Sequence, residues 1–350
     1  MMRTIRYCLL PLLVLLLAAC GGPDSEQAAE PQTAPAKLMV YSARNEHLIK
    51  PLFDRFTAQT GIAVGYVTDK AGPLLARLEA EGDNSPADIL MTVDAGNLWQ
   101  AAQLGVLAAT DSPLLADNVP QHLRDPDKRW VALTIRARTL VYATDKLAPA
   151  DLSSYEALTD EQWRGRLCLR TSKKVYNQSL VATMIAALGE EQTEAIVRGW
   201  IDNLAIEPLG NDTKVMEAIA VGQCDVGIVN SYYYGRLIEQ KPALPLALFW
   251  PNQSGDGMQG RGVHINVSGA GITRASKNKA LAQQLIEWLT TPEAQQMLME
   301  LNWEYPINPA VELTAELAAW GEFKADSINV SEAGRLQAAA VKLMDRAGYR

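Results

Sequence analysis

The segment most informative about the fold reads Val226-Gly-Ile-Val-Asn-Ser-Tyr-Tyr-Tyr-Gly-Arg-Leu237. The apolar residues at its start predict a buried strand, and its end suits a helix. Ligands of α/β sheets bind beyond the carboxyl ends of the strands, so Tyr232 and Tyr233 are expected to face a ligand. Tyr234 has apolar residues three and four positions later and is expected to pack against them. The alternative is that the tyrosines simply bury their rings and leave a hydroxyl in water.

Strand and helix patterns alternate on both sides of this stretch. Short apolar runs precede segments with apolar residues at helical spacing, and glycines such as Gly61 and Gly82 close those helices. This alternation predicts a parallel sheet with helices on its faces, so the fold class is α/β. Tyr176 is expected just before a helix that Asn177 caps. The predicted strands are 38–41, 62–67, 87–91, 166–170, 226–229 and 263–267, with a loop at 304–306 and a long extended segment, expected to cross between two domains, at 130–142.

The composition is globular and acidic. The 350 residues are 48% hydrophobic and 21% charged, which allows one large or two medium domains with a full core. The formal net charge is −8. Nucleic acid and anionic lipid surfaces attract clustered Lys and Arg, so the charge argues against both as partners.

The N-terminus has the pattern of a secretory signal peptide at residues 1–19. A basic start is followed by the apolar run Cys8 to Ala19, which is too short to span a membrane. The run ends in Leu17-Ala-Ala-Cys20, which resembles the bacterial lipobox, so Cys20 is the predicted lipidation site and membrane anchor. The alternative is a signal peptide without lipidation and a chance cysteine. Residues 21–36 carry no large apolar side chain and are predicted to be a flexible tether.

Two further cysteines, Cys168 and Cys224, remain in the mature chain. In an oxidising compartment an isolated pair favours a disulfide, and two buried thiols are the alternative. Neither cysteine has a neighbouring His or a zinc-type spacing, so neither is predicted to be a nucleophile or a zinc ligand.

Seven short motifs stand out: Val40-Tyr-Ser-Ala-Arg44, Ser85-Pro-Ala-Asp-Ile89, Arg136-Ala-Arg138, Tyr176-Asn-Gln-Ser-Leu180, Gly210-Asn-Asp-Thr213, Asn230-Ser-Tyr-Tyr233 and Glu304-Tyr-Pro306. Together they resemble the ferric-iron-binding periplasmic proteins of ABC importers. The resemblance implies a two-lobed solute-binding fold of type II, with a ligand cleft between the lobes and a hinge of crossing strands. It places the N-lobe at 37–135 plus about 265–310, the C-lobe at about 139–262, and C-terminal helices that pack on the lobes at 311–350.

The same resemblance implies that Tyr176, Tyr232 and Tyr233 bind the metal. Fe(III) is a small, hard cation that prefers anionic oxygen donors, and three phenolates balance its charge. At the first-lobe ligand the chain departs from the family motif. Many relatives have Arg-His-Tyr or Gln-His after the first strand, whereas this chain has Arg44-Asn-Glu-His47, so His47 and Glu46 are the candidates. The alternative for both is a solvated position in the first turn of a helix.

A small anion such as carbonate is the other expected occupant of the site. The resemblance implies that Arg44 and Arg136 hold it, with Arg138 as a further candidate. Arg136 and Arg138 lie two positions apart, so a strand points both to one face. The alternative for this pair is a set of salt bridges between strands or at the hinge.

The predicted function is a lipid-anchored periplasmic receptor, not an enzyme, which captures Fe(III) and passes it to an ABC permease. It is expected to be a monomer. One alternative keeps the fold but binds a small organic anion or amine, with Arg136 fixing a carboxylate. A secreted hydrolase is disfavoured, because no Ser, Cys or carboxylate pair has the sequence neighbours that activate it.

Overall fold

The computed structural model describes residues 37–255 and 260–350. The predicted signal peptide, Cys20 and the tether therefore lie outside the described residues. Within the described part, no helix is long and apolar enough to cross a membrane.

The first sheet has the strand order β2-β1-β3-β8-β4, with β9 beside β4. β1 pairs in parallel with β2 and β3, whereas β8 runs antiparallel to β3 and β4. The predicted alternation of strands and helices is confirmed here, but the prediction of a parallel sheet is wrong, because β8 and β9 pair antiparallel with their neighbours. The strands are β1 Lys37–Ser42, β2 Ala63–Thr68, β3 Ile89–Val93, β4 Val131–Ala143, β8 Ile265–Ile272 and β9 Tyr305–Pro306, and the helices around them are α1 Glu46–Thr60, α2 Ala71–Glu81, α3 Ala95–Gln103, α4 Pro113–Asn118, α9 Lys279–Leu289 and α10 Pro292–Asn302. We call these elements the first lobe.

The second sheet begins where the first ends, because β4 belongs to both. Its other strands are β5 Leu167–Cys168, β6 Val226–Asn230 and β7 Leu246–Phe249. β6 and β7 run antiparallel to β4, and β5 runs parallel to β6. Around it lie the helices α5 Val175–Leu188, α6 Glu190–Asp202, α7 Asp212–Ala220 and α8 Ser231–Gln240. We call these elements the second lobe.

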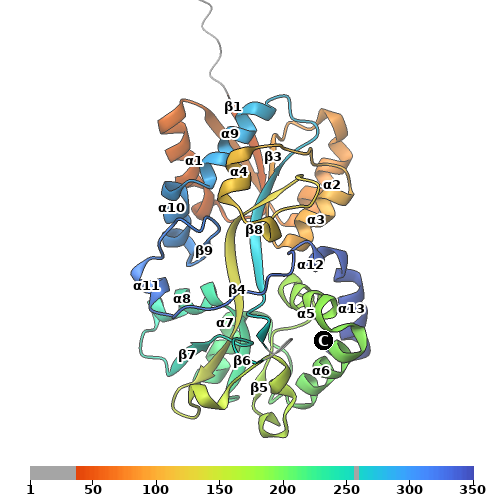
Figure 1. The fold of residues 1–350 in the computed structure, drawn as a ribbon, viewed down its shortest axis with the longest axis vertical. Helices are drawn as coiled ribbons and strands as arrows, with labels where there is room; N and C mark the ends of the chain where they lie inside the picture. The colour runs from red at the N-terminus through yellow and green to blue at the C-terminus, as the bar shows by residue number, and fades with distance from the viewer. Residues whose placement is uncertain (1–36, 256–259) are drawn as a thin grey trace, which may run out of the picture. The chain divides into compact units, whose positions relative to one another are not determined.

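β4 carries the chain from one sheet to the other, as predicted for the extended segment. Residues 131–137 of this strand pair with β8, and residues 138–142 pair with β6. In Figure 1 β4 and β8 run side by side along the middle of the fold. Two separate apolar cores flank the crossing, one centred on residues such as Leu52 and Leu90 and the other on residues such as Val181 and Ile228.

The C-terminal segment contacts both lobes. α12 (Glu332–Arg335) contacts α3 and α5, and α13 (Gln337–Arg346) packs on α5. The short helix α11 spans Ala315–Ala318. Single 3₁₀ turns lie at Gly82–Asn84, Gln121–Leu123, Pro149–Asp151, Glu156–Thr159 and Glu161–Trp163.

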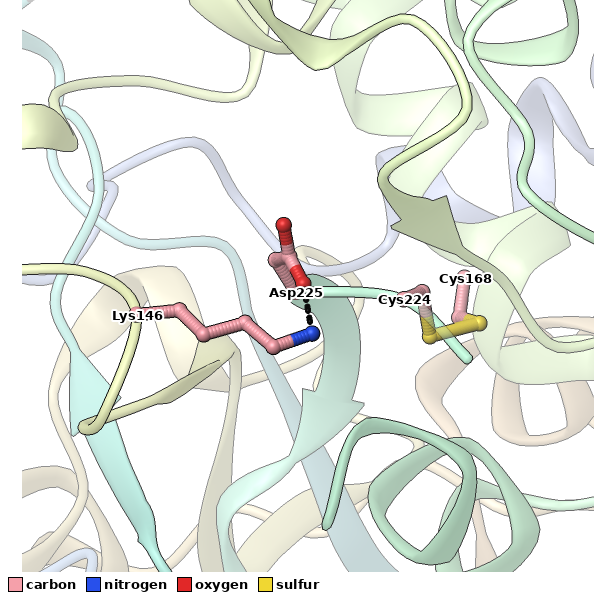
Figure 2. Close-up of a disulfide and its surroundings, with 4 residues drawn as sticks. All are labelled: Lys146, Cys168, Cys224 and Asp225. Atoms are coloured by element: carbon pink, nitrogen blue, oxygen red, sulfur yellow. Dashed lines mark hydrogen bonds and ion pairs between the residues drawn. A yellow bond between two sulfur atoms is a disulfide. The ribbon is translucent and has the colours of Figure 1, made fainter. Parts of the chain in front are cut away.

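A disulfide joins Cys168 of β5 to Cys224, with the sulfur atoms 1.98 Å apart. The bridge closes a loop of 56 residues and ties the start of β6 to its parallel neighbour. Figure 2 shows it beside an ion pair in which Lys146 Nζ lies 2.7 Å from Asp225 Oδ1.

Several local predictions are wrong. Tyr176 does not precede α5 and Asn177 does not cap it, because the helix begins at Val175 with Lys174 as its N-cap residue. Asn177 Oδ1 instead accepts from Arg138, and its Nδ2 donates to the carbonyl of Arg170. The side-chain oxygen that would cap a helix is therefore used in a tertiary contact. The predicted loop at 304–306 contains β9, which pairs with Thr134 and Ile135 of β4. The predicted strand at 263–267 begins later and runs to Ile272.

Candidate metal centre

The three tyrosines lie at the N-terminal ends of two helices. Tyr176 is the second residue of α5, and Tyr232 and Tyr233 are the second and third residues of α8. α8 follows β6 directly, so its tyrosines lie beyond the carboxyl end of a buried strand, as predicted. Helix N-terminal ends carry partial positive charge and favour anionic groups.

The structure brings these three side chains together. The ring centroids of Tyr232 and Tyr233 are 4.3 Å apart. The hydroxyls of Tyr176 and Tyr232 lie close enough for each to shift the pKa of the other. The guanidinium carbon of Arg170 lies 5.0 Å from the ring centroid of Tyr176 and 6.0 Å from that of Tyr233. We call Tyr176, Tyr232 and Tyr233 the tyrosine cluster.

Without a cation, Tyr176 and Tyr232 hold their protons tightly. Burial raises the pKa of Tyr232 well above 10, and the neighbouring tyrosines raise it further. Burial also raises the pKa of Tyr176, against the opposing effect of the Arg136 guanidinium. The hydroxyls of Tyr176 and Tyr232 are therefore neutral near pH 7, and only a strongly charged ligand can displace their protons.

Arg136 lies beside the cluster, Arg44 shares Ser268 with Arg136, and both arginines have unused donors. The guanidinium carbon of Arg136 is 5.9 Å from the ring centroid of Tyr232. Arg44 Nη1 donates to Glu304 Oε2 over 2.9 Å and to Ser268 Oγ over 2.6 Å, and Arg136 also donates to Ser268. Arg44 Nε and Nη2 and Arg136 Nε are buried and have no hydrogen-bond partner among the described residues. Buried N–H groups of this kind are expected to meet an acceptor, and a small anion fits.

One carboxylate partly neutralises the two arginines. Glu304 is 2% exposed and lies 3.8 Å from Arg136 in addition to its bond with Arg44. Burial acts to raise the pKa of Glu304, but Arg44 and Arg136 outweigh it, so the pKa is lowered and the group is ionised. Glu304 alone leaves the two arginines one positive charge, and the buried carboxylate of Asp94 also lies within electrostatic range of Arg136.

Arg138 has no free donor for an anion in this structure. All five N–H groups of its guanidinium are engaged by protein acceptors, on Asn177, Asp212, Asn230 and the carbonyl of Ile228. The alternative, an ion pair at the hinge, is what the structure contains, with Asp212 Oδ2 3.2 Å from Arg138 Nη1.

The structure does not bring Glu46 and His47 to the tyrosine cluster. Both side chains are exposed in the first turn of α1. Glu46 Oε1 accepts a hydrogen bond of 2.7 Å from the hydroxyl of Tyr66 on β2. In residues 37–255 and 260–350, no hydrogen bond or ion pair joins either residue to the three tyrosines.

Sequence reasoning missed two residues beside the cluster. Arg170 covers Tyr176 and Tyr233, and the guanidinium carbon of Arg236 lies 5.2 Å from the ring centroid of Tyr232. Arg170 follows β5, at the same sheet edge as the tyrosine pair, so the rule that ligands bind at this edge was a usable signal. Nothing in the sequence distinguishes Arg236 from an exposed helical arginine.

Residues 51–325 match the family model for bacterial extracellular solute-binding proteins. The chain belongs to this family. Among curated relatives, iron uptake protein A1 of Synechocystis is 40% identical over 341 residues, which cover 96% of this chain and 93% of that protein.

Solved structures of the family match the fold closely. The Trichodesmium protein IdiA (FutA), in complex with iron and citrate, has a TM-score of 0.86 at 40% identity and covers 90% of this chain and 100% of its own. The ferric iron-binding protein A of Mannheimia haemolytica, in an open conformation, has a TM-score of 0.83 at 36% identity. The match covers 90% of this chain and 99% of that protein's chain. These likenesses confirm the predicted resemblance and the two-lobed α/β fold.

Proposed function

We propose that this protein is an extracytoplasmic receptor that captures Fe(III) through the phenolates of Tyr176, Tyr232 and Tyr233 and delivers it to an ABC permease. The observation that carries the proposal is the convergence of three tyrosines from two helix N-termini beside two arginines with unused buried donors. The names of two relatives, an iron uptake protein and a ferric iron-binding protein, support it. A receptor of this kind binds and releases its cargo without chemical turnover.

The donor set suits a trivalent ion. Phenolate oxygens are hard anionic donors, and the described residues contain no group of three or more His, Cys, Asp or Glu side chains that could hold a metal instead. A bound cation lowers the pKa of its ligands, which offsets the raised pKa of the buried tyrosines. The cluster therefore favours a highly charged ion over a divalent one.

Arg44 and Arg136 are proposed to hold a synergistic anion, such as carbonate or a carboxylate, against the metal. Their unpartnered N–H groups support this role. The citrate in the Trichodesmium complex supports it for a related protein. Glu46 or His47 can serve as a first-lobe ligand only in a conformation that brings the first turn of α1 to the tyrosine cluster.

The remaining parts of the proposal concern the N-terminus and the lobes. The signal peptide and Cys20 export the chain and anchor it to a bacterial membrane, and residues 21–36 tether a monomeric receptor to the anchor. The Cys168–Cys224 disulfide is compatible with the oxidising periplasm. Residues 37–135 with about 265–310 form the N-lobe, about 139–262 form the C-lobe, and cargo binds in the cleft between them.

The direct test is the colour of the purified protein. Phenolate bound to Fe(III) gives a purple-red absorption band, so protein treated with ferric citrate is expected to develop this band and to lose it in Tyr176→Phe and Tyr232→Phe. Tyr234→Phe is the matched control, because Tyr234 lies on the same helix but donates to the carbonyl of Leu246, away from the cluster. A protein that stays colourless with excess ferric citrate contradicts the proposal.

The unused donors of Arg44 and Arg136 also favour a second candidate, a receptor for a small organic anion. Thermal unfolding separates the two, because a ligand that binds the folded state raises the midpoint. Stabilisation by carboxylic acids in the absence of iron supports the second candidate, and stabilisation that requires Fe(III) supports the first.

A further inference from the structure

Arg138 occupies the point at which β4 leaves the first sheet for the second. Its backbone N–H donates to the carbonyl of His264 over 2.9 Å on the first-sheet side, and its Cα pairs with that of Asn230 in β6. The side chain is 2% exposed. Its guanidinium therefore lies inside the protein at the junction of the two lobes.

The guanidinium joins the two segments that carry the tyrosines. Nε and Nη2 donate to Asn177 Oδ1 over 3.0 and 2.5 Å, and Nη1 donates to Asn230 Oδ1 over 2.9 Å. Asn177 directly follows Tyr176 in the first turn of α5, and Asn230 is the N-cap residue of α8, two positions before Tyr232. One planar group thus bonds to the starts of both tyrosine-bearing helices.

The acceptors are themselves fixed. Asn177 Nδ2 donates to the carbonyl of Arg170 and to the hydroxyl of Tyr349, each over 2.7 Å. Asp212 Oδ2 accepts from Arg138 Nη1 and from the backbone N–H of Asn230, over 3.2 and 3.0 Å. We call Arg138, Asn177, Asp212 and Asn230 the Arg138 network. It leaves the guanidinium no free donor and therefore one preferred orientation.

We infer that Arg138 is a positioning residue for the iron ligands, which fixes the separation of Tyr176 from Tyr232 and Tyr233 before the ion arrives. The inference rests on the proposed function and assigns this role to a residue that touches no cargo. Groups that orient metal ligands control metal affinity because the ligands then need no rearrangement on binding.

Stability alone is a weak reason for this network. Burying Arg138 and Asp212 costs desolvation, and well-packed apolar residues at such places are often as stable. A guanidinium offers a rigid fork of donors that can bridge two acceptors, whereas a lysine offers one compact charge. A fixed distance between the starts of α5 and α8 therefore explains why this position holds an arginine.

The test compares Arg138→Lys and Asn177→Ala with the parent protein. The readouts are Fe(III) affinity in competition with a chelator, the wavelength of the phenolate band and the thermal midpoint. We expect both variants to bind Fe(III) roughly 10–100-fold more weakly and to shift the band. In the double variant the two losses are expected to be less than additive, because both break the same bonds.

Gln295→Met is the matched control. Gln295 is a buried first-lobe side chain that donates to the carbonyls of Leu133 and Leu289 over 2.9 and 2.7 Å. Gln295→Met is expected to lower the thermal midpoint, as the network variants do, but to keep the Fe(III) affinity and the phenolate band. This difference separates a positioning role from a general loss of stability. Should Arg138→Lys fail to fold, Asn177→Ala decides alone, since it removes one side chain from a helix start.

The outcomes are distinct. If the parent binds iron and the folded variants show its affinity and its band, the inference is overturned while the proposed function stands. If the parent itself binds no Fe(III), the proposed function fails and the inference falls with it.

Discussion

Three buried arginines have different partners in this protein. Arg44 and Arg136 keep buried N–H groups without a partner, whereas Arg138 has none left. Arg136 and Arg138 point to one face of β4, but the strand changes sheets between them, so the first bonds to Ser268 and the second to Asn230. A sequence pattern finds such arginines, but only the fold shows which one keeps a free buried donor and which one bonds to the starts of the two tyrosine-bearing helices.

A prediction on pH follows from the tyrosine hydroxyls. Burial raises the pKa of Tyr176 and of Tyr232 above 10, so both groups carry protons at neutral pH and must lose them when iron binds. Binding therefore releases protons, and Fe(III) affinity is expected to decrease as the pH falls from about 8 to about 5. Calorimetric titration in two buffers of different ionisation enthalpy measures the release, which we expect to include about two protons from these residues.

The control for the proton release is Tyr232→Phe. It is expected to release about one proton fewer, because a phenyl ring has no proton to lose. Affinity that does not change with pH, after correction for the chelator, contradicts the assignment of phenolate ligands.

At the scale of elements, β8 pairs closely with the part of β4 that lies in the first sheet. A Cβ at Gly269 of β8 would lie 2.4 Å from the carbonyl oxygen of Val131, and one at Gly271 would lie 2.5 Å from that of Arg129. These separations are shorter than any van der Waals contact. The two glycines therefore allow β8 to approach its neighbour.

Gly269→Ala is expected to lower the free energy of unfolding by about 1–3 kcal/mol, because the backbone must shift to admit the methyl group. Denaturant titration measures the change. Gly72→Ala in α2 is the matched control, since its Cβ meets nothing within 4 Å. Replacing an exposed helical glycine by alanine raises the free energy of unfolding by about 0.5–1 kcal/mol. Equal stability of the Gly269 variant and the parent contradicts the account of the crossing.

Elements with a strong local signal were predictable from the sequence, and those fixed by distant partners were not. α1 ends at Gly61 with φ 73°, as the sequence pattern predicts. Asn177 was misassigned as a cap, because its partner Arg138 is 39 positions away in the sequence. The tyrosines were found because they follow a strand directly, while the Arg138 network depends on pairs 74 and 92 positions apart.

At the scale of the whole molecule, side-chain and helix contacts also connect the two lobes, in addition to the strand β4. The hydroxyl of Ser179 on α5 donates to both carboxylate oxygens of Asp94, the N-cap residue of α3, over 2.9 Å. α12 also contacts both helices. These contacts join first-lobe and second-lobe elements outside β4 and β8, so any opening of the lobes has to break or rearrange them.

The disulfide contributes to the stability of the second lobe. Replacing Cys168 and Cys224 by serine is expected to lower the free energy of unfolding by about 2–4 kcal/mol, because the unfolded chain regains the freedom of a long loop. Denaturant titration with and without reductant measures this. Reductant is expected to destabilise the parent and to leave the double variant unchanged. Two reactive thiols in the untreated parent contradict the bridge.

The most direct test of the central claim is a resonance Raman spectrum of the Fe(III)-treated protein, excited in its visible band. If the tyrosine cluster binds the ion, the vibrations of iron-bound tyrosinate rings are enhanced in the parent protein and disappear in Tyr232→Phe. Bound iron without these tyrosinate vibrations, or with vibrations that persist in the variant, contradicts the claim.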